Sequence, residues 1–455
     1  MPERNYTLPI LALLLLCVIG VSEYLTAPRI KPGPVEITYW EKWTAFEGDA
    51  IQAVVDEFNR SQNRIHVKLL TISGIENKTL LAVAGGNPPD VAGLYGPNVA
   101  QYADAKAILP MDEYCAKAGI RAEQYIPSYF EVGYYRNHIY ALPSAPASTA
   151  LHYNRDLLKQ AGADPDKPPK TIEEMTELAD KLVTKTPEGR IKVAGFLPAE
   201  PGWWNWSWGF FFGGRLWDGK AQITANCAEN VRAFEWIQSF SKKYGLSDLQ
   251  TFRSGFGTFS SPQNAFLSEK VAMEIQGVWM YNFITQYSPK LQWSASPFPH
   301  PKDRPDLANP TIVDEDVLVI PRGAKHIEEA FEFIKFVESQ KGMELLCMGQ
   351  RKHTPLKAVS EEFLRKHPNP YIRLFRELAF SKNSYVTPPV GIWPEYLAEL
   401  NTAFDNVLLM KMTPKEALDK VQVRVQAKLD QYLKILRLRD AQEARDRSAL
   451  VVRNG

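Results

Sequence analysis

Two groups of side chains in this sequence have the types that recognise polyhydroxylated ligands. Trp40, Glu41 and Trp43 stand close together, and Asp314–Asp316 is a run of three carboxylates. Aromatic faces stack on the C–H surfaces of a sugar ring, and carboxylates accept hydrogen bonds from its hydroxyls. Aromatic residues also fill hydrophobic cores, and core packing is the default for most of them. The residue types therefore allow a carbohydrate site without requiring one.

Further aromatic and polar residues could join such a site. The segment 202–217 (GWWNWSWGFFFGGRLW) is the densest aromatic run of the chain, so we expect at least one of its tryptophans to face a ligand and the others to fill a core. Trp393 lies in a proline-flanked turn, and Ser144 lies in a predicted loop. The candidate contacts in these segments are Ser144, Trp203, Trp204, Trp206 and Trp393.

Catalytic and metal-binding patterns are absent from the sequence. It has no Walker A loop, GxGxxG, HExxH or GxSxG, and none of its seven histidines stands at metal-ligand spacing from another. Cys17, Cys115, Cys227 and Cys347 lie far apart, so we expect free thiols rather than a disulfide framework or zinc site. We predict no catalytic residue, no metal and no cofactor. A glycosidase needs two carboxylates about 5–10 Å apart, a spacing that a sequence does not reveal.

The composition and the N-terminus narrow the class of protein. The chain has 455 residues and a net charge of +1, without the basic excess of nucleic-acid-binding proteins. Leu8–Val21 is an uncharged apolar run, shorter than the about 20 residues of a membrane span, and it indicates an export signal. We expect residues 1–34 to be signal or anchor plus linker and the rest to lie outside the cytoplasm. Cleavage, retention as an anchor and lipidation at Cys17 all stay open.

The first part of the chain alternates between strand and helix patterns. Residues 35–40, 65–70 and 90–94 read as strands, and 45–59 and 78–84 read as helices. This order indicates parallel βαβ units in an α/β sandwich. Ligands of open α/β sheets bind beyond the carboxyl ends of the strands. The residues found there are Trp40, Glu41, Trp43 and Tyr95.

Later elements are less regular. We expect a short strand at 140–143, a Ser/Ala/Pro loop, and a second strand at 150–153. A helix at 263–268 and a strand at 317–320 follow, the latter preceded by the acidic run. Helices dominate from residue 361 onward, and the highly charged end is expected to be frayed.

Several segments occur in the order typical of one family. They are ITYWEKW, VVDEFN, KTLLAVAGGNPPDV, IYALPSAPASTALHYNRDLL, AFLSEKVAMEIQGVW, VLVIPRGAKHIEEAFEFIKFVES, KHTPLKAV and MTPKEALDKVQ. Together they resemble the carbohydrate-binding proteins of ABC importers, the extracellular solute-binding proteins akin to maltose-binding protein. The resemblance covers about residues 35–433.

This resemblance implies a two-lobe periplasmic-binding-protein fold of the α/β class. Each lobe would be a mixed sheet flanked by helices, with a ligand cleft at a hinge that closes on the ligand. The first lobe would comprise 35–148 and about 300–350, and the second 149–299 and about 351–433. Residues 434–455 form a charged extension that we cannot match to the family.

The resemblance also implies a function and a set of contacts. A monomer would capture a mono- or oligosaccharide without catalysis and deliver it to the transmembrane subunits of an ABC permease. Trp279 matches the Gly-x-Trp of the family, whose aromatic ring commonly approaches the ligand. The complete predicted ligand-binding set is Trp40, Glu41, Trp43, Tyr95, Ser144, Trp203, Trp204, Trp206, Trp279, Asp314, Glu315 and Trp393.

Three other functions remain as alternatives. A glycosidase or lyase would use the same aromatic residues to line its subsites. Asp314–Asp316 replaces the Gly-Gly or Gly-Ser turn that the family often has at this point, and three carboxylates would suit a polyamine but not a sugar phosphate. A membrane-tethered sensor could also keep the binding fold without a permease.

Overall fold

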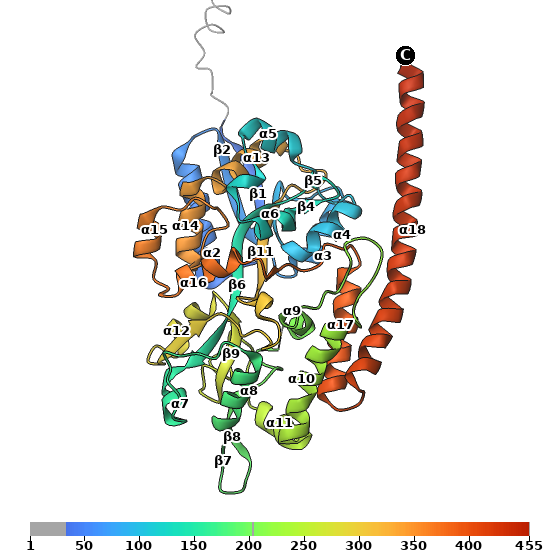
Figure 1. Ribbon diagram of the computed structural model, residues 1–455. Coiled ribbons are helices and arrows are strands. Elements are labelled where there is room, and N and C mark those ends of the chain that lie inside the picture. Colours follow the sequence, from blue (N-terminus) through green and yellow to red (C-terminus); the bar gives the residue numbers. More distant parts are fainter. Residues whose placement is uncertain (1–32, 203, 455) are drawn as a thin grey trace, which may run out of the picture.

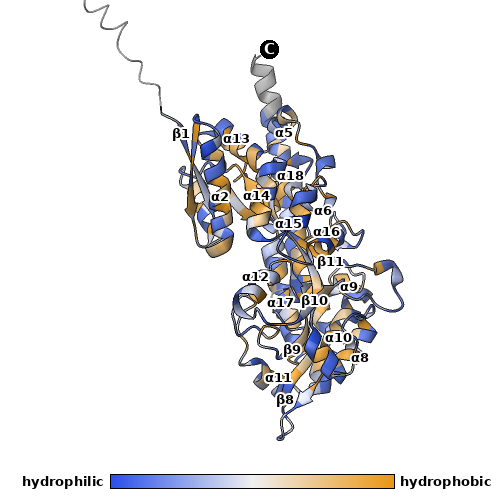
Figure 2. Ribbon diagram, turned by 90° about the vertical axis from the view of Figure 1, so that its left-hand side faces the viewer, coloured by the Kyte–Doolittle hydropathy of each residue, from blue (hydrophilic) through white to orange (hydrophobic). Residues whose placement is uncertain are grey.

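Two lobes, one above the other, make up the part of the chain that the computed structural model describes (Figure 1, Figure 2). This part comprises residues 33–202 and 204–454, without the side chains of 447–454. The expected export segment and Trp203 therefore lie outside the described residues. Within those residues, no helix is both long and apolar enough to cross a membrane.

The first lobe begins with the predicted βαβ units. Strand β1 (Val35–Glu41) pairs in parallel with β2 (Ile65–Thr71) and with β3 (Val91–Tyr95). Helices α2 (Ala45–Ser61) and α3 (Ile75–Ala84) connect them. Alternate residues of β1 are buried, such as Ile37 and Tyr39, and they pack on Val54 and Phe58 of α2. The sequence-based prediction of parallel units is confirmed here.

Segments from two later parts of the chain add to this lobe. Between β3 and the hinge lie α4 (Val99–Asp104), α5 (Asp112–Ala118), α6 (Pro127–Gly133) and the hairpin β4 (Tyr134–Tyr135) and β5 (His138–Ile139). The chain later returns with α13 (Ile327–Val337), α14 (Gln340–Gln350), α15 (Glu361–Lys366), α16 (Ile372–Ala379) and β12 (Ser384–Tyr385).

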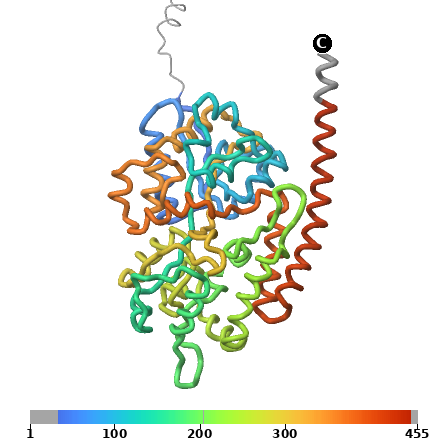
Figure 3. The backbone as a smooth tube through the Cα atoms, viewed as in Figure 1, coloured from blue at the N-terminus to red at the C-terminus, as the bar shows by residue number. Residues whose placement is uncertain are grey.

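Two long strands connect the lobes. Strand β6 (Leu142–Asn154) pairs through residues 142–148 with β11 (Thr311–Val319) and through 149–153 with β9 (Val271–Gly277) of the second lobe. The strand order is β2-β1-β3-β11-β6-β9-β8-β7, with β10 on β6 and β12 on β11. The trace in Figure 3 shows the chain crossing repeatedly between the lobes near these strands.

These strands correct two expectations. The predicted Ser/Ala/Pro loop is the middle of β6, because residues 142–154 are all buried and pair with strands of both lobes. The acidic run Asp314–Asp316 likewise lies inside β11 rather than before a strand. The helix expected at 263–268 is a series of turns.

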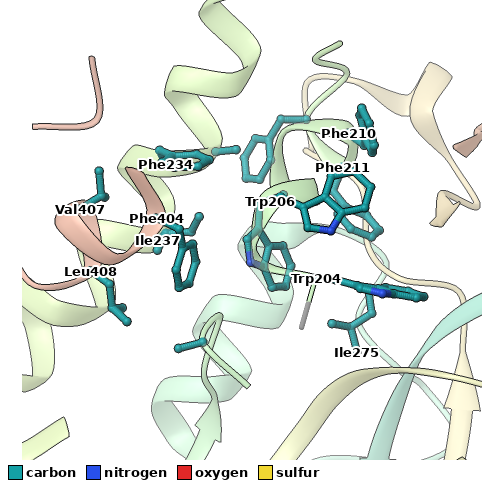
Figure 4. Close-up of a cluster of buried hydrophobic side chains, with 14 of the residues drawn as sticks. Trp204, Trp206, Phe210, Phe211, Phe234, Ile237, Ile275, Phe404, Val407 and Leu408 are labelled. Carbon is teal, nitrogen blue, oxygen red and sulfur yellow. The ribbon is translucent and has the colours of Figure 1, made fainter. Parts of the chain in front are cut away.

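The second lobe has an aromatic core. Its strands are β7 (Thr184–Lys185), β8 (Ile191–Phe196), β9 and β10 (Trp293–Ser296), and its helices are α7 (Arg155–Gln160), α8 (Ile172–Lys181), α9 (Trp208–Phe211), α10 (Ala228–Tyr244), α11 (Leu246–Arg253), α12 (Met280–Tyr287) and α17 (Trp393–Leu408). Figure 4 shows Trp204 and Trp206 beside Phe211, with Phe234 of α10 and Phe404 of α17 nearby. The aromatic run at 202–217 thus mainly builds this core.

The C-terminal part is helical, as expected from residue 361 onward, and the helix continues through the charged end that was expected to be frayed. Helix α18 (Pro414–Asn454) starts against the second lobe and runs alongside the first (Figure 1, Figure 3). Among the described cysteines, Cys115 and Cys347 are buried, Cys227 is half-buried, and all three are unbonded.

Candidate ligand-binding site

A cavity of about 420 Å³ lies between the lobes, where β1, β3 and β11 present their residues toward the second lobe. Strand ends, the hinge and the facing helix all contribute to its wall. The lining residues are Trp43, Thr44, Ala45, Phe46, Glu47, Tyr95, Ala145, Ala147, Phe259, Ser260, Trp279, Phe283, Gln286, Tyr287, Asp314, Glu315, Asp316 and Lys352.

A buried lysine organises the first-lobe wall. Nζ of Lys42 lies 2.9 Å from Oδ1 of Asp316 and 3.2 Å from Oε1 of Glu41. Burial alone would lower the pKa of Lys42, but these two carboxylates hold it above its ordinary value. The lysine is therefore charged, and it is committed to protein partners rather than to a ligand.

Glycine in β3 makes room for this group. A Cβ at Gly93 would lie 1.9 Å from Oε2 of Glu41, so a side chain could not fit there. The same oxygen accepts a 2.6 Å hydrogen bond from the hydroxyl of Tyr39. Glu41 is 2% exposed and lies beneath the cavity wall rather than on it.

The indole of Trp43 is fixed by the same network. Its Nε1 donates a 2.6 Å hydrogen bond to Oδ2 of Asp316, and its ring meets Tyr95 edge-on at 5.9 Å. The ammonium groups of Lys42 and Lys352 lie 5.3 and 5.6 Å from the ring centroid. Held in this way, the rings of Trp43 and Tyr95 form a rigid aromatic wall of the cavity.

Lys352 is a second buried cation with its own partner. Its Nζ lies 2.9 Å from Oε1 of Glu47. Burial would lower its pKa, but Glu47 and Asp316 raise it. Because Glu47 neutralises Lys352, this lysine offers no unpaired positive charge to a ligand. The pair also links the region after α14 to the start of α2.

Asp314 and Glu315 lie on the hinge strand with fewer partners. The carboxylate of Asp314 accepts a 2.8 Å hydrogen bond from the amide of Glu315 and is half-buried. Burial, together with the charge of Asp316, raises its pKa to about 7. Burial and the nearby Glu338 raise the pKa of Glu315 far above its ordinary value, and neither of its carboxyl oxygens has a hydrogen-bond partner. Asp314 is thus the carboxyl best placed to accept hydrogen bonds from a ligand.

The second-lobe wall is aromatic. Trp279 follows β9, and a Cβ at Gly277 would lie 2.2 Å from its ring, so the ring packs directly over the glycine backbone. Phe283 of α12 meets Phe259 at 5.9 Å. Phe46, from the first lobe, reaches across to Phe283 at 6.4 Å. The lobes therefore touch across the cavity in this structure.

The structure brings together some of the predicted site residues and separates others. Trp43, Tyr95, Trp279, Asp314 and Glu315 line the cavity. The others lie elsewhere: Trp40 packs against the first-lobe core, Glu41 and Ser144 are buried beneath the wall, and Trp204, Trp206 and Trp393 lie in the second-lobe core. Trp206 and Trp393 stack edge-on at 4.9 Å.

Several residues that line the cavity or support its wall were not predicted from the sequence. Lys42 stands at the same strand end as Trp43, so the strand-end rule could have indicated it. Phe46, Phe283 and Lys352 carried no comparable signal, because their place depends on how the lobes meet. Among the described residues, no group of histidine, cysteine and acidic side chains could hold a metal ion.

A hinged two-lobe fold with an aromatic-walled cavity between the lobes defines a binding protein for small solutes. Residues 46–344 match the family described as bacterial extracellular solute-binding protein, and the chain belongs to this family. The resemblance seen in the sequence is confirmed. The protein accordingly binds a solute outside the cytoplasm, and its family consists of binding proteins rather than enzymes.

Relatives are known in sequence and in structure. The sn-glycerol-3-phosphate-binding periplasmic protein UgpB of Pectobacterium atrosepticum is 22% identical over 87% of this chain and 92% of its own length. The structure of CpMnBP1 with mannotriose bound is 29% identical, has a TM-score of 0.74, and covers 86% of this chain and 99% of its own. The sugar-binding protein MalE of Xanthomonas citri is 18% identical, with a TM-score of 0.72 over 89% of this chain and 99% of its own. The predicted two-lobe α/β fold is confirmed.

Proposed function

We propose that this protein captures a neutral mono- or oligosaccharide between its lobes and delivers it to the transmembrane subunits of an ABC importer. The observation that carries this proposal is the position of Asp314. Its carboxylate faces the cavity between the aromatic wall of Trp43 and Tyr95 and that of Trp279. Aromatic faces on two sides and a hydrogen-bond acceptor between them suit a sugar ring.

The charges of the wall favour a neutral ligand over a phosphate ester. The charged lining residues are Glu47, the run Asp314–Asp316 and Lys352, and Lys352 is already paired with Glu47. A phosphate group would meet carboxylates without an available cation. For this reason we propose a saccharide such as those bound by CpMnBP1, rather than the sn-glycerol 3-phosphate of the UgpB proteins.

Further parts of the proposal concern partners and location. We propose a monomer that releases its sugar unchanged, with residues 1–34 serving as export signal or membrane anchor. The lobe boundaries near residues 148 and 300 expected from the sequence belong to the same proposal. They follow from the family pattern and from the strands that the lobes share. We place the last crossing into the second lobe after β12 rather than near residue 350, because Phe363 of α15 packs in the first-lobe core.

Binding to the full-length protein tests the function. Tryptophan fluorescence and thermal shift would be recorded against mannobiose, mannotriose, other mono- and oligosaccharides, sn-glycerol 3-phosphate and spermidine. A ligand that binds only the folded state, at a hundredfold excess over Kd, stabilises it by about 2.7 kcal/mol. We expect a saturable response to one saccharide, recovered chemically unchanged after overnight incubation.

Other outcomes would overturn parts of the proposal. A response to spermidine alone would identify a polyamine receptor that uses the acidic run Asp314–Asp316. A response to glycerol phosphate alone would refute the neutral-ligand argument. A shortened or rearranged sugar in the incubated sample would reveal a carbohydrate-active enzyme.

A further inference from the structure

Helix α18 is rooted in the second lobe. Leu418, Val421, Val425 and Leu429 are at most 2% exposed and belong to the same core cluster as α17. The side chain of Gln426 adds hydrogen bonds to the backbone, donating to the carbonyl of residue 221 and accepting from the amide of residue 223, both at 2.8 Å. The first half of α18 therefore moves with the second lobe.

The second half of the same helix contacts the first lobe. Its centre there is Asp104, the last residue of α4, which is 6% exposed. Asp104 accepts a 2.7 Å hydrogen bond from the hydroxyl of Tyr135, and its Oδ1 lies 3.5 Å from Arg136 and 3.6 Å from Arg439 of α18. Arg439 also donates to the backbone carbonyl of Asp104.

Two further ion pairs extend this contact along the helix. Asp440 pairs with Arg136 of the β4–β5 hairpin, and Glu443 pairs with Lys106 after α4. Single exposed pairs contribute little, but a network around a buried carboxylate contributes more. The three residues of α18 are one cation, Arg439, and two anions, Asp440 and Glu443, and each faces a first-lobe partner of opposite sign.

The helix and the ligand cavity lie on opposite sides of the hinge strands. Figure 1 shows α18 on one side of β6 and β11 and α12, which lines the cavity, on the other. A groove of about 790 Å³ separates the lobes on the α18 side, with Arg136, Trp217 and Arg437 among its lining residues. A rotation that opens the cavity therefore changes the distance between the root of α18 and Asp104.

The ion-pair network coexists with contacts across the cavity. In the same structure Phe46 meets Phe283, and the side-chain amide of Asn282 donates a 3.1 Å hydrogen bond to the backbone carbonyl of Gln350. Both sets of contacts join the two lobes, and they are satisfied in the same lobe arrangement. Any group that is satisfied in only one arrangement shifts the population toward it.

We propose that α18 is a strap that binds the two lobes behind the hinge and biases them toward the arrangement in which the cavity is closed. Residues that never touch the ligand would thus set part of its affinity. The closed arrangement would already be populated without ligand, so less binding free energy would be spent on closing the lobes. The effect on affinity rests on the proposed function, whereas the effect on the lobe arrangement does not.

Distances between the lobes in the ligand-free, full-length protein test the strap directly. Spin labels at Lys68→Cys on β2 and Lys185→Cys on β7, both exposed, report the separation in a Cys17→Ser, Cys227→Ser background. The test variant is Arg439→Glu, which places a carboxylate beside Asp104. The matched control is Arg445→Glu on the same helix, an exposed position outside the network.

We expect Arg439→Glu to broaden or shift the distance distribution and Arg445→Glu to leave it as in the parent. Glu443→Lys should act like Arg439→Glu, and adding Lys106→Glu should reverse its effect by restoring an ion pair. Affinity for the saccharide found in the titrations should be about two- to fivefold weaker in Arg439→Glu. Unchanged distances in both Arg439→Glu and Glu443→Lys would refute the strap, whatever the ligand proves to be.

Discussion

The ammonium of Lys42 lies 2.9 Å from the carboxylate of Asp316, and this ion pair joins the end of β1 to the hinge strand β11. Both side chains are buried, at 5% and 6% exposed. The other carboxylate oxygen of Asp316 holds the indole of Trp43. The pair therefore orients an aromatic wall of the cavity and leaves Asp314, two residues earlier, as the available carboxylate on the same face of the strand.

Replacing this lysine should destabilise the fold and disorder the wall. Lys42→Met leaves the carboxylates of Glu41 and Asp316 buried without a cation, and breaking a buried pair from one side costs about 3–5 kcal/mol. Denaturant unfolding followed by circular dichroism measures the loss. Ligand affinity should fall as well. Asp316, which accepts the hydrogen bond of the Trp43 indole, would no longer be held in place by Lys42.

Two further variants check the cause. Lys159→Met, at an exposed position of α7, should change the unfolding free energy by less than about 0.5 kcal/mol. Adding Asp316→Asn to Lys42→Met should recover part of the loss, since it removes one of the two uncompensated charges. Equal stability of Lys42→Met and the parent would show that the ion pair does not contribute to the fold.

Ligand affinity should depend on pH through Asp314. Burial, with the charge of Asp316 added, raises the pKa of this carboxyl to about 7. Sugar hydroxyls donate to the ionised form, so affinity should be highest above pH 7 and should weaken as the group is protonated below it. The limit for one group is about tenfold per pH unit, and we expect roughly tenfold weaker binding at pH 5.5 than at pH 8 by calorimetry.

The variant Asp314→Asn isolates this group from its titrating neighbours. Glu338, whose pKa burial raises to about 8, and Glu315 also lie near the hinge. If Asp314 is responsible, Asp314→Asn should bind more weakly at pH 8 and show a nearly flat profile from pH 5.5 to pH 8. A profile as steep as that of the parent would assign the pH dependence to the other carboxyls.

The sequence predicts the strand-end part of the site because that part depends on local order. Trp43 and Tyr95 follow parallel strands, and the carboxyl ends of such strands meet at one edge of a sheet. The family pattern places Trp279 after the glycine that its ring covers. These three aromatic residues line the cavity as their positions in the sequence suggest.

The positions of the other site residues and of the C-terminal helix depend on contacts between segments that are distant in the sequence. Whether a tryptophan of the aromatic run faces the cavity or the core is decided by elements such as α17, whose Trp393 packs on Trp206 and helps leave it 7% exposed. Phe46 lines the cavity because it meets Phe283, more than two hundred residues away. The contact of the C-terminal helix with the first lobe was missed since its charged residues read as a solvated end, whereas their partners lie at residues 104–136.

Two buried histidines near the hinge should make the fold sensitive to acid. His152 is fully buried, stacks on Trp293 at 5.4 Å and has its pKa lowered by burial to about 3; burial likewise lowers the pKa of His353 to about 3. The unfolded chain takes up these protons near pH 6.5 while the folded protein does not. Stability is therefore complete above pH 6.5 and is lost as the pH falls toward 3, by at most about 1.4 kcal/mol per pH unit for each histidine.

Unfolding free energies at pH 7 and pH 4.5 measure this effect within each protein. The difference between the two pH values should be smaller in His152→Phe than in the parent, even if His152→Phe is less stable at both. His66→Phe, at an exposed position of β2, should leave the difference unchanged. Equal pH dependence in all three proteins would exclude His152 as a source of the acid sensitivity.

A methyl group added at Gly277 should weaken ligand binding through the ring that covers it. The new Cβ would lie 2.2 Å from the indole of Trp279, so the ring must leave its position in the cavity wall. Aromatic stacking contributes about 0.5–1.5 kcal/mol, so Gly277→Ala should lower affinity by up to about tenfold, close to the effect of Trp279→Ala.

Gly255→Ala is the matched control, because a Cβ there meets no atom within 4 Å, and it should bind as the parent does. A shifted tryptophan emission in Gly277→Ala together with unchanged affinity would show that the ring moves without having touched the ligand. Weaker binding in both Gly277→Ala and Trp279→Ala, with the control unaffected, would assign the second-lobe stacking surface to Trp279.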